Sequence, residues 1–241
     1  MAKKIEFVAR NPFFWDVAPK PFPASEAVPK WWKDARPYAP SPEDPKGTKL
    51  IIENKVANLT FKKCTPMLDA ITSGYIVPLW SDVQIRPTEG GAPRITWRQQ
   101  EFEVFQTHGI GAEHVQRPKG YSSIVFKYMN PWIPKTPPGY SVLITTPFGY
   151  RDTPFYAIPA VIDSDRSTLE ILSPVWVREG FEGIVERGTP MFQVTPFKRE
   201  EWKSEFSHYE AGEYDKIEAA NFNATLVNHY IRKVWSKKTY K

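Results

Sequence analysis

Cysteine is almost absent from this chain, and Cys64 is the single one among 241 residues. One cysteine excludes an internal disulfide and a multi-cysteine zinc site. This usage is typical of a protein kept under reducing conditions. We therefore expect Cys64 to serve as a small buried apolar residue.

Long apolar runs are also missing. The longest stretches have the length of a strand, such as residues 75–80, and fall far below the ~20 residues that a membrane-spanning helix needs. We expect no membrane among the partners.

Familiar catalytic motifs are lacking as well: the sequence has no Walker loop, no Gly-x-Gly-x-x-Gly and no Gly-x-Ser-x-Gly. His108, Glu113 and His114 could form a metal site, but their spacing is not that of a helical metal motif. The neighbouring glycines favour a loop whose histidines make ordinary hydrogen bonds. We expect no metal and no cofactor.

The net charge of +5 is concentrated at the end of the chain. Removing the five basic residues of 232–241 from the 32 in the chain leaves 27, which equals the number of acids. This basic tail predicts either a solvated helix end or an arm that binds phosphates, which leaves nucleic acid as a weakly supported partner.

Proline and aromatic residues are dense near the N-terminus. Nine prolines between positions 12 and 45 exclude a central strand or a long helix, whereas the many aromatic rings argue against disorder. We predict that residues 1–47 form an extended arm, with a helical turn near 27–34, that packs on the body or on a neighbouring subunit. Its candidate assembly residues are Phe13, Phe14, Trp15, Trp31 and Trp32.

Residues 48–198 predict a β-rich body. Thr65, Pro66 and Gly74 bound a two-turn helix, because they suit the start and the end of a helix. Short strand-like runs follow, with a hairpin around 89–93. The predicted strands are 75–79, 82–86, 94–98, 101–105, 124–129, 140–145, 155–162, 169–176, 183–186 and 191–197. Such spacing is typical of a single β-sandwich, a jelly roll or a partly closed barrel.

The end of the chain, 199–241, has a helical period. Within 199–209, Trp202 and Phe206 lie four residues apart, and an apolar stripe of helical spacing runs through 215–237. We predict C-terminal α-helices that pack on the body.

The segment 137–199 carries three motifs in order: Pro138-Gly139 at the start of a strand, Val161-Ile162-Asp163-Ser164-Asp165, and Met191-Phe192-Gln193-Val194. This order resembles the β-fold of trimeric dUTPases and dCTP deaminases. The resemblance implies a dUTPase-like barrel and a trimer, with Asp163 orienting the attacking water. It also places ligand-binding residues at Asp163, Asp165 and Gln193, with Mg²⁺ as the cofactor if nucleotides are hydrolysed.

The sequence differs from the pattern of that family in three ways. The Pro-Arg-Ser phosphate motif and the glycine-rich tail are absent, and Arg166 replaces the tyrosine expected after the second aspartate. The alternative interpretation of residues 163–165 is a hairpin turn in which Asp and Ser cap the backbone.

Most of the chain is also similar to a family of uncharacterised proteins from tailed bacteriophages. The shared features are Pro29-Lys30-Trp31-Trp32-Lys33, residues 62–70 with 73–75, residues 136–141, Ile162-Asp163-Ser164-Asp165 and residues 193–199. The resemblance implies a phage origin, with the host cytoplasm and the virion as locations.

These observations leave three functional hypotheses. The first is a non-catalytic phage structural or virion-associated protein, a homo-oligomer with a trimer favoured, that assembles through its β-body and aromatic arm, with other virion proteins as further partners. The second is a nucleotide-binding or nucleotide-hydrolysing enzyme. The third is a module that binds nucleic acid or a host protein.

Overall fold

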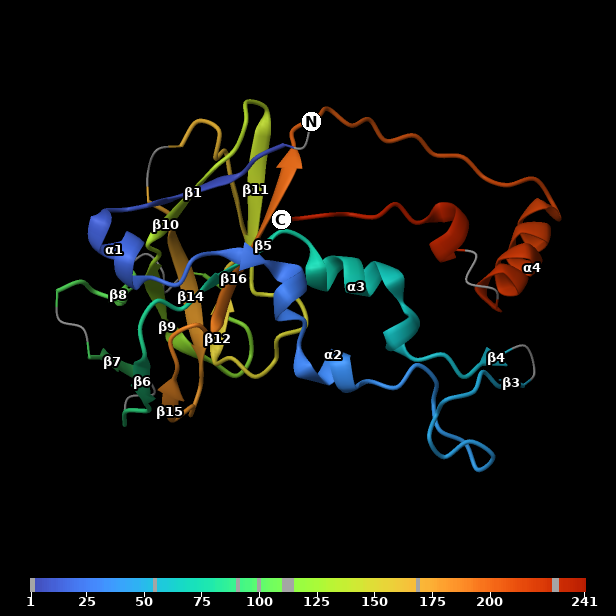
Figure 1. Cartoon of the computed structure of the whole chain (residues 1–241), viewed down its shortest axis with the longest axis horizontal. Coiled ribbons are helices and arrows are strands. Elements are labelled where there is room, and N and C mark those ends of the chain that lie inside the picture. Colours follow the sequence, from blue (N-terminus) through green and yellow to red (C-terminus); the bar gives the residue numbers. More distant parts are fainter. Residues whose placement is uncertain are drawn as a thin grey trace.

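The chain is mainly β-structure, built from several antiparallel sheets (Figure 1). The computed structural model describes residues 3–53, 56–89, 92–98, 101–109, 115–167, 170–226 and 230–241. Within these ranges no sheet closes into a barrel. No helix in the same ranges is long and apolar enough to span a membrane.

Two sheets form most of the body. The five-stranded sheet has the order β13-β11-β16-β5-β2, and the four-stranded sheet has the order β12-β14-β9-β8. All their pairings are antiparallel. The strands are β2 (Phe22–Pro23), β5 (Tyr75–Pro78), β8 (Phe105–Thr107), β9 (Tyr121–Met129), β11 (Tyr140–Thr145), β12 (Phe155–Ala157), β13 (Ala160–Ile162), β14 (Leu172–Arg178) and β16 (Pro190–Lys198).

Three smaller sheets complete the β-structure. The predicted hairpin is confirmed, because β6 (Val83–Arg86) pairs antiparallel with β7 (Arg94–Trp97), and β15 (Gly183–Val185) adds a third strand. β1 (Glu6–Ala9) pairs with β10 (Trp132–Lys135), and β3 (Ile52–Glu53) pairs with β4 (Val56–Ala57).

Several predicted strands differ from those observed. The run 155–162 is two strands in different sheets, because Pro159 between them lacks the amide that a continuous ladder needs. The strand predicted at 101–105 lies instead at β8, four residues later at its start. β10 lies in a proline-flanked segment that the sequence did not predict as a strand.

The two-turn helix is confirmed as α3 (Thr65–Thr72), with Pro66 in its first turn. Gly74 follows with φ +69°, and a Cβ at this position would lie 2.2 Å from the carbonyl oxygen of Val194. Only glycine therefore allows the chain to turn from α3 into β5 so close to β16.

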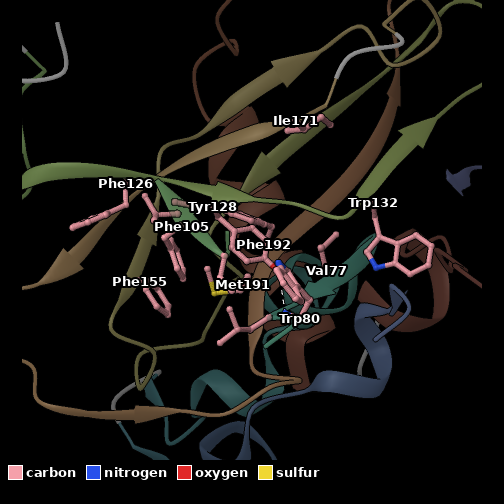
Figure 2. Packing of buried hydrophobic residues seen from close by; sticks show 14 of the residues in the cluster. Val77, Trp80, Phe105, Phe126, Tyr128, Trp132, Phe155, Ile171, Met191 and Phe192 are labelled. Atoms are coloured by element: carbon pink, nitrogen blue, oxygen red, sulfur yellow. Dashed lines mark hydrogen bonds between the residues drawn. The ribbon is translucent and has the colours of Figure 1, made fainter. Parts of the chain in front are cut away.

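The hydrophobic core contains residues from both main sheets (Figure 2). The rings of Tyr128 on β9 and Phe192 on β16 lie 5.4 Å apart. Tyr128 is fully buried, yet its hydroxyl donates to the Pro78 carbonyl and accepts from the Trp80 amide, both at 3.1 Å. Burial raises the pKa of Tyr128, so this phenol stays neutral and joins the two sheets by hydrogen bonds.

The N-terminal segment is part of the same fold. Besides β1 and β2, it contains α1 (Pro12–Val17), the 3₁₀ turn η1 (Ala24–Ala27) and α2 (Lys30–Asp34). Asn11 caps α1 by accepting from the Phe14 amide at 3.1 Å. The predicted helical turn near 27–34 is therefore present, divided between η1 and α2. A second 3₁₀ turn, η2 (Phe61–Lys63), lies just before α3.

The C-terminal region departs most from the prediction. Residues 199–210 form no helix, so the helix predicted at 199–209 is wrong. The helix predicted at 215–237 is observed as α4 (Glu213–Leu226) and the π-helical η4 (Tyr230–Val234). Short helices depend on tertiary packing for stability, and Trp202 and Phe206, 85% and 94% exposed, provide none here.

Candidate functional site

The Asp163–Asp165 turn forms a compact charged cluster at one end of β11. The Arg199 guanidinium, just after β16, donates to Asp165 from both terminal nitrogens, at 2.9 and 2.5 Å. The same group reaches Asp163 Oδ1 at 3.2 Å and Ser141 Oγ at 2.8 Å. Residues from three strand ends therefore meet on one arginine.

Further hydrogen bonds complete this cluster. Ser141 Oγ donates to Asp163 Oδ1 at 2.6 Å, and the Gly139 amide donates to Asp165 Oδ2 at 2.8 Å. The Ser164 hydroxyl lies 2.7 Å from that of Thr136. The alternative interpretation is met only in that residues 164–166 form a turn. The side chains bond to Arg199, Ser141, Thr136 and the Gly139 amide, and the flanking strands β13 and β14 lie in different sheets, so the turn is not a hairpin.

The electrostatics of the cluster centre on Asp165. Its side chain is only 4% exposed, and the hydrogen bonds from Arg199 lower its pKa to about 2. A carboxylate held ionised in this way neither accepts nor releases a proton near neutral pH. Asp163 is 52% exposed, so one face of its carboxylate stays open to solvent, while its Oδ1 is already engaged.

Gln193 does not join this cluster. It pairs with Thr145 at the opposite end of β11, whereas Lys198 pairs with Tyr140, a separation of five residues or roughly 16 Å along the strand. The Gln193 side chain is fully buried. Its Oε1 accepts from the Phe148 amide at 2.9 Å, and its Nε2 donates to the carbonyls of Ser73 at 2.6 Å and Ala70 at 2.8 Å.

The geometry around Gln193 gives it a structural role. The amide joins β16 to the end of α3 and to the loop after β11, and both of its polar atoms have partners. A ligand that reached Gln193 would have to break these bonds in the interior of the protein.

The aromatic residues of the N-terminal segment pack on their own chain. Phe14 is fully buried, with its ring 5.1 Å from that of Trp80, and Phe13 packs against the same core. Trp32 is 2% exposed. Phe14 and Trp32 therefore have almost no side-chain surface left for a neighbouring subunit.

Two tryptophans of this segment keep exposed surface. Trp15 is 54% exposed, with the Lys20 amine 4.1 Å from its ring centre. Trp31 is 37% exposed, and its Nε1 donates to the Gly149 carbonyl at 2.6 Å.

Two surface cavities could hold small molecules. One of about 440 Å³ lies between α2 and β15, and one of about 480 Å³ is lined by Phe13, Trp80, Arg98 and Arg187 among others. In the second cavity the Arg187 guanidinium already donates to the Val17 carbonyl at 2.7 Å. The linings include Lys30, Asp152 and Glu186 in the first cavity and Ser81 and Asp82 in the second. Among the described residues, however, no side-chain hydroxyl or base of either lining is hydrogen-bonded to one of these carboxylates, as a paired catalytic group would be.

The histidine cluster considered from the sequence is only partly described. Glu113 and His114 lie outside the described residues, whereas His108 follows β8 and its amide donates to the Val125 carbonyl at 2.8 Å. Across the described ranges no group of three His, Cys, Asp or Glu side chains could hold a metal ion. Cys64, expected to be buried, is partly exposed just before α3.

The sequence did not predict a long exposed excursion that begins after Arg199. We call residues 200–218 the outgoing limb; residues 200–216 are all exposed and extend away from the sheets into α4 (Figure 1). The limb carries four strongly exposed aromatic side chains: Trp202, Phe206, Tyr209 and Tyr214. The four-residue spacing of Trp202 and Phe206 favours a helix, whereas the accompanying acids indicate a solvated segment.

The chain then returns to the body through residues 235–241, which we call the strap. Trp235 Nε1 and Lys238 Nζ both donate to Asp69 Oδ2 on α3, at 2.8 and 2.7 Å. The Tyr240 ring meets that of Tyr75 edge-on at 6.0 Å, and the Tyr75 hydroxyl donates to the Lys241 carbonyl at 3.1 Å. Burial raises the pKa of both tyrosines.

A scan against protein-family models, a search of curated proteins and a search of solved structures each found no match.

Proposed function

We propose that this chain is a non-catalytic structural protein, a β-sandwich body that joins a larger assembly through its C-terminal excursion. The virion of a tailed bacteriophage, and the host cytoplasm in which it forms, are the proposed setting, in keeping with the resemblance in the sequence. A homo-oligomer and other virion proteins are the proposed partners.

The observation that carries the proposal is the exposure of the outgoing limb. Trp202 and Phe206 are 85% and 94% exposed on a segment without regular secondary structure. Large aromatic side chains are enriched in protein interfaces. Exposure of several of them to water is unfavourable, and a binding partner that buries them would lower the free energy. The proposed assembly element is therefore the C-terminal excursion, whereas the sequence predicted the N-terminal arm.

A second group of exposed apolar residues supports an assembly surface on the side of the molecule where α4 lies. Val56 and Phe61 are 70% and 72% exposed, and Ile52 is 43% exposed. These residues lie on or beside the β3–β4 hairpin, which projects in the same direction as α4 in Figure 1.

The chemistry of the Asp163 turn supports a non-catalytic role. Its carboxylates are held by Arg199, Ser141 and a backbone amide, and Gln193, the third candidate ligand residue, is buried at the other end of the strand. The Arg199 guanidinium of this cluster already bonds to Asp163, Asp165 and Ser141, so most of its capacity to bind a phosphate is in use.

The test is quantitative mass spectrometry of gradient-purified particles of the source phage. We expect a constant ratio of this chain to the major capsid protein. A Trp202→Ser/Phe206→Ser variant should be incorporated at least about tenfold less, because the loss of one aromatic anchor costs about 2 kcal/mol or more. Trp15→Ser is the matched control and should be incorporated normally.

Three results would contradict the proposal. One is absence of the chain from purified particles, and another is normal incorporation of the double variant. The third is Mg²⁺-dependent turnover of a deoxynucleotide that is lost in Asp163→Asn, which would establish the enzymatic alternative instead.

A further inference from the structure

The strap is connected to the body by a long segment that does not pack on it. Residues 200–234 separate Arg199 from the strap, a span of 35 positions. Within the part of this segment whose side chains are described, residues 201–220 and 230–234 make no hydrogen bond or ion pair to the described residues of 3–198. The position of the strap is therefore set by its own contacts and by the reach of the excursion.

The contacts of the strap do not require that it belongs to the same chain. They consist of two hydrogen bonds to Asp69 and the pairing of Tyr240 and Lys241 with Tyr75. A strap from a second copy could make the same contacts. Docking within one chain must close a loop of 35 residues, which reduces its entropic advantage over docking between chains.

The two halves of the excursion carry opposite charge. The outgoing limb has seven acids and two bases, a net charge of −5, whereas residues 230–241 have five bases and no acid, a net charge of +5. Among the described residues, no ion pair joins the outgoing limb to residues 230–241 of the same chain. The halves are thus complementary to each other but unpaired within one copy.

We infer that the partner of the excursion is a second copy of this chain, and that the strap docks on α3 and β5 of that copy. This inference rests on the proposed function. The excursions of neighbouring copies then lie alongside each other, acidic outgoing limb against basic return. The exposed aromatic residues of the limb are buried between them. When two copies exchange an identical element, they form a closed symmetric oligomer, and the exchanged element makes the same contacts that it makes within one chain.

Thiol cross-linking between two distinguishable chains tests the exchange. In a Cys64→Ser background, one chain carries Thr72→Cys and a differently tagged chain carries Thr239→Cys. The two positions lie on α3 and on the strap, and neither side chain makes the contacts that hold the strap. The chains are coexpressed, purified through both tags and treated with a short flexible bismaleimide.

Exchange predicts a covalent product of the two different chains, with the peptide of residue 72 joined to the peptide of residue 239. One chain that carries both cysteines is the control for reach and must give a linked peptide. A pair of Thr72→Cys and Ser207→Cys chains is the control for chance encounter, since Ser207 lies on the outgoing limb, and should give at least about tenfold less product. Light scattering should find an oligomer.

The inference is overturned if the doubly substituted chain links internally, the mixed chains do not link, and the protein is a monomer at high concentration. Incorporation into particles that still depends on Trp202 and Phe206 would then leave the proposed function standing with a different partner. Cross-linked oligomers that never enter particles would support exchange of the strap but reject the proposed role in the virion.

Discussion

Replacement of Gln193 by methionine tests whether this buried amide is structural. The substitution keeps the length and approximate volume of the side chain but removes both polar atoms. The Phe148 amide and the Ser73 carbonyl then lose the partners that Gln193 supplies at 2.9 and 2.6 Å. The Ala70 carbonyl still accepts from the Ser73 hydroxyl at 3.0 Å, so two groups become unsatisfied.

The expected magnitude follows from those two groups. Both groups are partly buried, and a buried polar group without a partner costs about 1–3 kcal/mol, so Gln193→Met should lower the free energy of unfolding by about 3 kcal/mol, in the lower half of the summed range. For a domain of this size that corresponds to a fall in Tm of about 6–12 °C.

Urea unfolding followed by tryptophan fluorescence measures this difference. Gln106→Met on β8 is the matched control, because Gln106 bonds to Glu103 at the surface, and it should change stability by no more than about 0.5 kcal/mol. Equal stability of Gln193→Met and the unmodified protein would refute the structural role and return Gln193 to the candidate ligand residues.

Two further predictions concern the N-terminal segment and the acid limb of stability. Phe14→Ala should destabilise the protein by about 3–5 kcal/mol in the same assay, because the ring is fully buried, whereas Trp15→Ala next to it should cost less than about 1 kcal/mol; equal losses would contradict packing of Phe14 in its own chain. The pKa of Asp165 is about 2 in the folded protein, below its usual 3.8, so its contribution is complete above about pH 4 and is lost as the pH falls toward 2. Tm measured between pH 5 and pH 2 should therefore fall less steeply in Asp165→Asn than in the unmodified protein, and parallel curves would show that the carboxylate does not contribute.

Local chemistry was sufficient to predict several elements. Pro66 and Gly74 marked the bounds of α3, because one residue suits a first helical turn and the other tolerates a positive φ. The hairpin of β6 and β7 was predicted from two strand-like runs around a turn. These features depend on residues close together in the sequence, and so does the mainly β character of the chain.

Other features were decided by tertiary contacts. Asp163 and Asp165 form a motif in the sequence, but their partner Arg199 lies more than thirty positions away and meets them only because β11 pairs with both β13 and β16. Gln193 was grouped with them by resemblance, although strand register places it at the other end of β11. Distances across a sheet depend on register, which a motif does not contain.

The C-terminal region shows the same division. The sequence by itself determined the helical period after residue 215, the exposed acids and the basic tail, since these are properties of composition and spacing. Only the tertiary structure decided that residues 199–210 stay extended and that the strap returns to Asp69 and Tyr75. The physical reason is that composition and spacing do not contain contacts between distant parts of the chain: Asp69 and Tyr75, which hold the strap, lie 166 positions before their partners, and no surface of the body covers Trp202 and Phe206.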